Sequence, residues 1–189
     1  EQVRQRFAGE KISDRLVSLF DVDARPIRKG KLAKPTQFGY VVQLAEVTAN
    51  TRRGARGLVH PPKLATGSAG ENTLLPATAS ELKALRLRPR EASFDGGFGH
   101  LLTPAQLAAV RPVMEIFIAG SSHNTGSRRT RRRRARYRVG CEGRIAHLKR
   151  RYGAGRSRLK GEIGARIWEG WVVFAYDVET AAALPVGTG

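Results

Sequence analysis

The stretch Arg138-Val-Gly-Cys-Glu-Gly-Arg-Ile-Ala-His-Leu-Lys-Arg-Arg-Tyr152 has the periodicity of an amphipathic helix. Cys141, Ile145, Leu148 and Tyr152 recur at intervals of three and four residues, so they share one face. This pattern predicts a helix packed on the body of the protein.

A second column of side chains runs beside this apolar stripe. It contains Glu142 and Lys149, and Arg138 lies one helical turn before Glu142. A carboxylate between cations at the edge of a buried stripe fits a metal ligand beside a bound phosphate backbone. It also fits a solvated helix face crossed by salt bridges, so the helix alone does not decide between the two.

The charge balance is the strongest feature of the composition. The 189 residues include 34 Lys and Arg against 16 Asp and Glu, a formal net charge of +18. Such a balance favours a polyanionic partner, of which nucleic acid is the usual one. With 41% hydrophobic residues, the chain has enough apolar side chains for one domain with a core.

Membrane insertion and disulfide bonding are both excluded by the sequence. No apolar run approaches the roughly 18 residues that cross a bilayer, and the single cysteine, Cys141, has no partner for an internal disulfide. We therefore expect no membrane partner and a cytoplasmic, nucleoid-associated protein. The chain begins with Glu1 rather than Met, which leaves a processed chain or a fragment as open alternatives.

The order of the predicted elements indicates a mixed α/β fold. Three strands form an antiparallel meander, and further strands alternate with flanking helices. The predicted strands are 16–20, 38–47, 57–60, 91–94 and 113–119, and the predicted helices are 74–85, 103–110, 138–152 and 165–178.

The chain also divides by composition. Residues 1–14 form a polar linker or helix remnant, 15–180 the main domain, and 181–189 a disordered tail. Within the domain, 120–137 is a basic tract with seven arginines in nine positions, expected to stay flexible until it meets counter-charge. In the last helix, one face is expected to pack in the core; it consists of Ile167, Trp168, Trp171, Phe174, Ala175 and Val178.

Carboxylates follow two of the predicted strands. Asp21 and Asp23 end the first, and Asp95 follows the fourth and precedes two glycines, which allow a ligand to approach the backbone. If these strands are neighbours, their ends bring the acids together, and a helix with Glu142 adds a third. Three converging carboxylates need a cation, and Mg²⁺ prefers such oxygen ligands. The alternative is that Asp21 and Asp95 are ordinary turn residues.

Three segments resemble the DDE transposases of bacterial insertion sequences. Residues 18–30 with 38–43 are similar to the family's first-aspartate strand and the strand after it, and 94–99 to its second-aspartate motif. Arg138, Glu142 and Lys149 have the spacing of its glutamate-helix signature, and Gly143–Gly153 and 156–161 continue the likeness. The family's signature usually has a tyrosine three residues before the arginine, and this chain has Ala135 at that position.

The resemblance implies an RNase H-like fold and a two-metal reaction on DNA. Asp21, Asp95 and Glu142, with Asp23 as an alternative ligand, would hold two Mg²⁺ ions, Mn²⁺ being the other candidate ion. The protein would hydrolyse phosphodiesters at the element's ends and transfer the freed 3′ ends to target DNA. The expected partners are double-stranded DNA and a second copy in a synaptic complex. The expected DNA-binding residues are Arg138, Lys149, Arg144, Arg131, Arg132, Arg133, Arg134, Arg150 and Arg151.

Two other functions remain open from the sequence. The first is an inactive or truncated DNA-binding remnant, because family members commonly carry a helical DNA-binding region before the catalytic domain and this chain does not. The second is an RNase H-like nuclease, which shares the fold and the metals.

Overall fold

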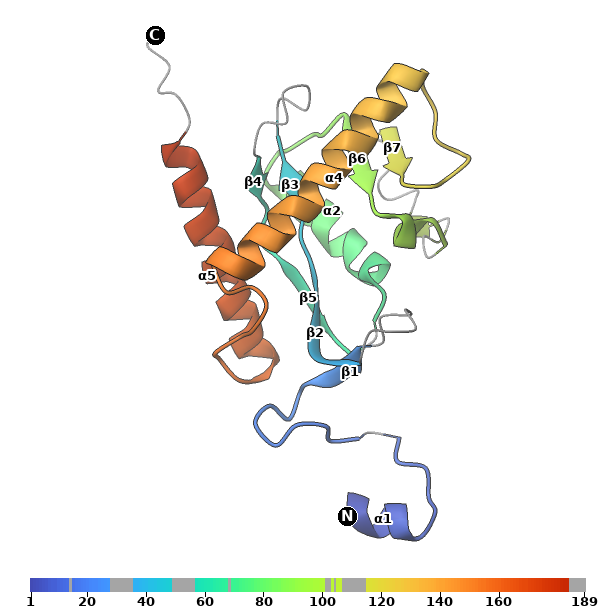
Figure 1. The fold of residues 1–189 in the computed structure, drawn as a ribbon, viewed down its shortest axis with the longest axis vertical. Helices are drawn as coiled ribbons and strands as arrows, with labels where there is room; N and C mark the ends of the chain where they lie inside the picture. The colour runs from blue at the N-terminus through green and yellow to red at the C-terminus, as the bar shows by residue number, and fades with distance from the viewer. Residues whose placement is uncertain are drawn as a thin grey trace.

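The computed structural model describes residues 1–13, 15–27, 36–48, 57–67, 69–100, 103, 105–106 and 115–183 and shows a mixed α/β protein (Figure 1). The helices are α1 (Gln2–Phe7), α2 (Leu75–Ala84), α4 (Arg128–Arg151) and α5 (Gly161–Ala182), with 3-10 turns η1 (Glu71–Leu74) and η2 (Gly96–His100). The strands are β1 (Arg25–Ile27), β2 (Gln37–Gln43), β3 (Glu46–Val47), β4 (Leu58–Val59), β5 (Lys63–Thr66), β6 (Glu91–Phe94) and β7 (Glu115–Ile118).

The described strands form three small sheets. The largest is antiparallel with the order β1-β2-β5, in which Pro26 pairs with Phe38 and Val41 with Ala65. Strands β3 and β4 form an antiparallel pair, and β6 and β7 a parallel one. The mixed α/β class is therefore confirmed, and a three-stranded antiparallel sheet is present, but its members differ from the predicted meander.

The predicted strand at 16–20 is wrong, because none of these residues is in a strand. The hydroxyl of Ser18 accepts hydrogen bonds from the backbone N–H groups of Phe20 and Asp21, at 3.2 and 3.1 Å. The Asp21 carboxylate then accepts one from the N–H of Asp23 at 3.1 Å. Such local side-chain bonds stabilise turns in place of a strand. The first strand of the described residues is instead β1, which follows these turns.

Several other predicted elements are confirmed with shifted boundaries. The strand at 38–47 is present as β2 and β3, that at 57–60 as β4, that at 91–94 as β6, and that at 113–119 as β7 over its described part. The helix at 74–85 is present as α2. The prediction of a helix at 103–110 lies mostly outside the described residues, and so does the tail beyond residue 183.

Helix α4 contains the amphipathic stretch 138–152. The predicted helix at 138–152 is confirmed to Arg151, but α4 begins ten residues earlier, at Arg128. Its N-cap is Ser127, whose side chain accepts a hydrogen bond from the Thr130 N–H at 3.2 Å. The expectation of a flexible tract over 120–137 is therefore wrong from Arg128 onward, where the arginines are helical.

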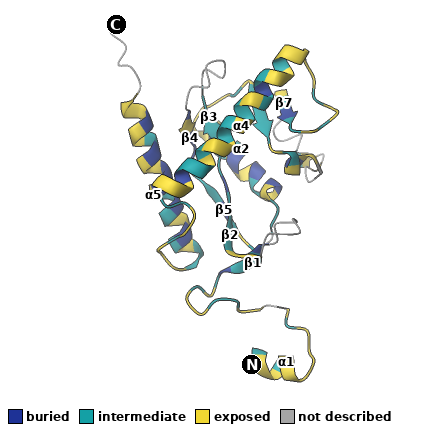
Figure 2. Ribbon diagram, viewed as in Figure 1, coloured by how far each residue is buried: buried dark blue, intermediate teal, exposed yellow. Residues whose placement is uncertain are grey.

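The main core lies where α4 and α5 meet strand β4. Leu148 and Tyr176 are each 1% exposed, and Val59, Val172 and Val173 pack with them. Figure 2 shows this buried face of α5 and the exposed residues on its other side. Since each fully buried aliphatic side chain contributes about 1.5–3 kcal/mol, this cluster fixes α4 against the rest of the chain.

The face of α5 that packs in the core differs from the predicted one. Ile167, Trp171, Phe174 and Val178 are between 48% and 65% exposed. Only Trp168 is half-buried, and its indole N–H donates to the Gly153 carbonyl at 3.1 Å. The helix is apolar on both sides, so the sequence pattern did not identify the buried face.

Helix α1 lies away from the other elements, at the end of an extended segment (Figure 1), and buries no residue. The structure contains no helix, within its described ranges, that is long and apolar enough to cross a membrane.

Candidate active site

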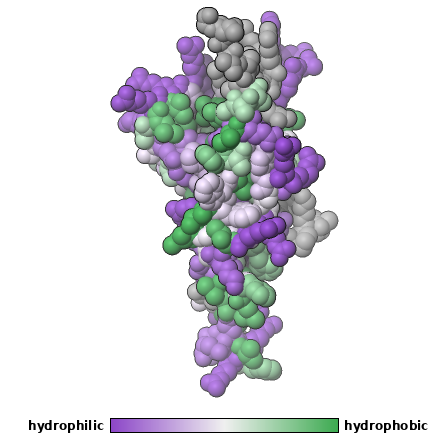
Figure 3. Space-filling model, turned by 90° about the vertical axis from the view of Figure 1, so that its left-hand side faces the viewer, coloured by the Kyte–Doolittle hydropathy of each residue, from purple (hydrophilic) through white to green (hydrophobic). Residues whose placement is uncertain are grey.

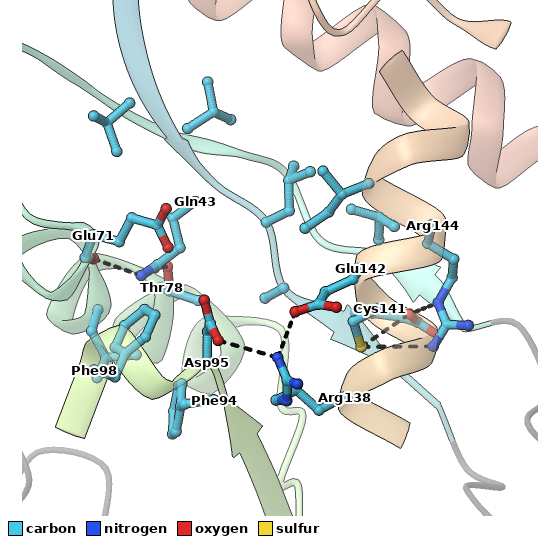
Figure 4. Close-up of a pocket in the computed structure, with 18 of the residues that line it drawn as sticks. Gln43, Glu71, Thr78, Phe94, Asp95, Phe98, Arg138, Cys141, Glu142 and Arg144 are labelled. Atoms are coloured by element: carbon cyan, nitrogen blue, oxygen red, sulfur yellow. Dashed lines mark hydrogen bonds and ion pairs between the residues drawn. The ribbon is translucent and has the colours of Figure 1, made fainter. Parts of the chain in front are cut away.

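A broad cleft of about 3130 Å³ is lined by α4, β2, β6 and the turn after β6, and we call it the central cleft. Asp21, Asp95 and Glu142 all line it. Its inner wall is fixed by a hydrogen-bond chain (Figure 4), in which Thr78 donates to Gln43 at 2.5 Å and Gln43 donates to the Glu71 carbonyl at 2.7 Å.

Asp95 and Glu142 meet at Arg138, as Figure 4 shows. One guanidinium nitrogen, Nη1 of Arg138, lies 3.1 Å from Asp95 Oδ1 and 2.6 Å from Glu142 Oε1. Two acids that are 47 residues apart in the sequence therefore share one cation. Both carboxylates remain more than half exposed, at 68% and 59%, and are open to a ligand entering the cleft.

The local structure explains how these two acids are placed. Asp95 directly follows β6, and its Oδ1 accepts a hydrogen bond from the Gly96 N–H at 2.7 Å, which starts the turn η2. Glu142 lies one helical turn after Arg138 on α4, the spacing at which side chains on a helix face each other. The ion pair between Arg138 and Glu142 is thus local in the sequence. The ion pair between Arg138 and Asp95 depends on the packing of α4 against β6.

Asp21 lies in the wall of the same cleft but has other partners. Its two carboxylate oxygens lie 2.8 and 3.0 Å from the hydroxyl of Tyr40, which donates to them. Burial and this hydrogen bond to Asp21 raise the pKa of the Tyr40 phenol, so the donor proton stays in place. Tyr40 lies on β2, and the sequence analysis did not single it out.

Asp23 caps the first turn of α5 and does not line the cleft. Its Oδ2 accepts a hydrogen bond from the backbone N–H of Glu162 at 3.1 Å. A carboxylate at a helix N-terminus satisfies an otherwise free donor. Asp21, the aspartate expected as the ligand, therefore lines the cleft, whereas Asp23, its alternative, does not.

Within the described ranges, no three His, Cys, Asp or Glu side chains are grouped closely enough to hold one metal ion. Asp95 and Glu142 are brought together as predicted, and Asp21 is not joined to them. The donor set of the pair nevertheless fits Mg²⁺, since both are exposed carboxylates with oxygen donors. The position between them already accepts a positive group, the Arg138 guanidinium.

Several arginines predicted to bind DNA are paired within the protein. Arg144 forms an ion pair with Glu46. Arg133 and Arg134 bind Glu91, and Arg134 also binds Glu115. These three side chains stabilise the packing of α4, so their predicted role in DNA binding does not fit their positions.

Other basic residues remain exposed on α4 and the loop after it. Those that line the central cleft and are exposed are Arg128, Arg129, Arg132, Arg136, Lys149 and Arg156. Of the other predicted residues, Arg131 donates to the Gly126 carbonyl, Arg151 pairs with Glu179 at 3.0 Å, and Arg150 is exposed outside the cleft. Four of the exposed cleft residues were not predicted as site residues, although all lie in basic segments of the sequence: Arg128, Arg129, Arg136 and Arg156.

Comparison of the chain with protein-family models, with curated proteins and with solved structures finds no match.

Glu169 is a buried acid of the cleft that the sequence did not indicate. Glu169 on α5 is 5% exposed, lines the cleft, and makes no hydrogen bond or ion pair to any other residue that the structure describes. Burial raises the pKa of its carboxyl to about 7, and the positive charge of Lys149 limits the rise. In the sequence, Glu169 stands between Trp168 and Gly170, where nothing marks it as buried.

We expect Glu169 to make the protein less stable as pH rises from about 4.5 to about 7. In this window the folded state holds a proton that the unfolded state has released, so rising pH favours unfolding. The shift corresponds to a loss of up to about 3 kcal/mol in the free energy of unfolding. Urea titrations at pH 5 and 7.5 should show this loss in the native chain. It should be absent in Glu169→Gln and retained in Glu10→Gln, which alters an exposed acid. An unchanged pH slope in Glu169→Gln would contradict the assignment.

Proposed function

We propose that the chain is the catalytic domain of a DDE transposase of a bacterial insertion sequence, with an RNase H-like arrangement of its acids. The observation that carries the proposal is the meeting of Asp95 and Glu142 at Arg138. One acid follows a strand and the other lies on a helix, within a cleft whose rim is basic. This is the pattern of residues on which the resemblance to the family was based.

In this proposal, the protein's own residues perform three tasks. Asp95 and Glu142, with Asp21 from the cleft wall, hold Mg²⁺ ions. Lys149 and the exposed arginines of α4 bind the phosphate backbone, which they can reach because they line the same cleft. Arg138 neutralises the two acids when the ions are absent and binds a phosphate oxygen when they are present. When bound, the ions lower the pKa of the attacking water or 3′-hydroxyl and stabilise the leaving oxygen.

A second candidate function is a basic DNA-binding protein without catalysis. The specific observation in its favour is Asp21, whose carboxylate is bound by Tyr40 rather than placed beside Asp95 and Glu142. Both functions predict DNA binding that weakens steeply with salt, because many phosphates are neutralised. Only cleavage separates the two.

The test uses the purified chain and a supercoiled plasmid that carries the genomic sequences flanking its gene. With Mg²⁺, we expect nicks at the element's ends that leave 3′-hydroxyls, followed by joining of these ends to a second DNA. With EDTA, neither product should form, while DNA binding persists. Binding without any Mg²⁺-dependent nick would favour the second candidate, and nicking without joining would favour a nuclease.

A further inference from the structure

Glu169 is an acid on the inner face of α5. It shares this face with Ala165, Val172 and Tyr176, which are all buried. Figure 3 views the molecule from the other side of α5, where hydrophobic and hydrophilic side chains both reach the surface. Because Glu169 is 5% exposed and lines the central cleft, a ligand reaches its carboxyl through the cleft.

The carboxyl of Glu169 has no hydrogen-bond or ion-pair partner in the part of the chain that the structure describes. Buried polar groups are costly when unpaired, and they nearly always bind protein, water or a ligand. Glu46 follows this rule, since its side chain is also 5% exposed and is paired with Arg144. Glu169 is therefore available to a group that enters the cleft.

The loop Gly153–Gly155 contacts both Lys149 and the residue beside Glu169. A Cβ built on Gly155 would lie 3.9 Å from Cβ and Cγ of Lys149, so the loop packs against the stem of this lysine. At its other end, the Gly153 carbonyl accepts the indole N–H of Trp168 at 3.1 Å. Lys149 is exposed and lines the cleft, so its ammonium group is open to a phosphate.

The other charged groups on the surrounding elements are occupied, neutral or exposed. His60, after β4, is neutral at pH 7 because burial lowers its pKa, and Arg156, in the loop after α4, is exposed. Burial raises the pKa of Glu169, and Lys149 is the charged group that limits the rise. The side chains that are held by partners are Arg166 on α5, Glu142 on α4, Lys63 on β5 and Asp21 before β1.

An ionised carboxylate in the wall of this cleft opposes the binding of a polyanion. A phosphate held by Lys149 brings a second negative charge toward Glu169, and like charges in a poorly hydrated site disfavour ionisation. The carboxylate therefore takes up a proton from water as the phosphate binds. In its protonated form, the carboxyl gains an O–H group that can donate to a phosphate oxygen.

We propose that Lys149 and Glu169 form one phosphate-binding subsite of the central cleft, in which Glu169 is protonated when a backbone phosphate of nucleic acid is bound. The proposal rests on the DNA binding of the proposed function and is independent of metal and cleavage. It gives Glu169 a positioning role, because the charge of this acid decides how firmly Lys149 holds the phosphate.

Fluorescence anisotropy with a labelled duplex of arbitrary sequence, in EDTA, tests the proposal at pH 6 and pH 8. Native affinity should be about five- to tenfold weaker at pH 8, the effect expected for uptake of one proton. Glu169→Gln cannot ionise and should lose most of this difference, so that it binds more tightly than the native chain at pH 8. Glu10→Gln, at an exposed acid outside the cleft, should retain it.

The role of Lys149 is tested in the same assay. Lys149→Ala should weaken binding and remove most of the pH difference, because no phosphate is then held beside Glu169. In this background, Glu169→Gln should change the affinity at pH 8 by less than about twofold. Arg150→Ala is the matched control, since Arg150 is the next residue and is exposed outside the cleft. It should retain the pH difference.

Isothermal titration calorimetry in two buffers of different ionisation enthalpy counts the protons. At pH 7.5, the native chain should take up about half a proton or more on binding the duplex, and Glu169→Gln less than half of that amount. Histidines that titrate in this range are present in both proteins, so the difference reports Glu169. Circular dichroism verifies that each variant is folded.

The outcomes separate this proposal from the proposed catalysis. Equal pH dependence in the native chain and Glu169→Gln would overturn it, and so would loss of the pH difference in Arg150→Ala with its retention in Lys149→Ala. Absence of DNA binding at both pH values would overturn it together with the proposed function. Absence of Mg²⁺-dependent nicking alone would remove the catalysis and leave the subsite supported by the binding results.

Discussion

Replacing Asp95 or Glu142 with alanine is expected to reduce Mg²⁺-dependent nicking of end-bearing DNA by about 1,000-fold or more, which corresponds to about 4 kcal/mol of transition-state stabilisation. Each carboxylate contacts Arg138, at 3.1 Å from Asp95 and 2.6 Å from Glu142. When one of the two carboxylates is removed, the other is neutralised by Arg138 alone. A divalent ion then has one of these two carboxylate ligands instead of both. Single-turnover cleavage of a labelled substrate measures the loss.

The matched control is Glu162→Ala. Glu162 forms the same kind of pair as Glu142, with an arginine one turn away on its own helix, but lies outside the cleft. It should retain native nicking and native DNA affinity. Native nicking by either Asp95→Ala or Glu142→Ala would remove the proposed site.

The two aspartates near β1 give a comparison within the same assay. Asp21→Asn should lower nicking as Asp95→Ala does, because Asp21 lines the cleft. Asp23→Asn should retain nicking, because Asp23 caps α5. The reverse order would mean that the acids rearrange when DNA and metal bind.

The sequence predicted the elements whose signals are local. The periodicity of apolar residues in 138–152 predicts a helix, and the four-residue spacing of Arg138 and Glu142 predicts that they pair on it. Helix α4 confirms both. The strand at 91–94 precedes Asp95 as expected. By contrast, the apolar run at 16–20 was read as a strand, whereas Ser18 and Asp21 bond to the backbone and form turns. Short runs of this kind fit either structure.

What the sequence could not predict depends on contacts between distant segments. The arginines at 128–136 repel one another locally, which favours an irregular tract. Glu91 on β6 and Glu115 on β7 supply the counter-charge, and neither is near them in the sequence. Likewise, Asp21 is bound by Tyr40 because β2 passes beside it, a contact that spans 19 residues.

Replacing Arg134 with alanine is expected to lower the free energy of unfolding by about 3 kcal/mol. Its side chain is 2% exposed and lies between α4 and the β6–β7 pair, where it binds both Glu91 and Glu115. Burial would raise the pKa of Glu91, but hydrogen bonds from Arg134 and Arg133 lower it overall. Alanine at position 134 removes one of these donors and leaves the partly buried Glu91 with a single cation. The cavity left by the missing Arg134 side chain lowers the free energy of unfolding further.

Urea denaturation at pH 7 measures this change, and Arg132→Ala is the matched control, because Arg132 is an exposed arginine two positions away. The control should alter stability by less than about 0.5 kcal/mol. Because the pKa of Glu91 is lowered in the folded state, its contribution to stability is present at neutral pH and is lost as the pH falls through its folded value. Arg134→Ala should therefore also show a weaker loss of stability on acidification. Equal stability of the two variants would mean that the arginines of α4 act only as a charged surface, and that its N-terminal half is not held by Glu91 and Glu115.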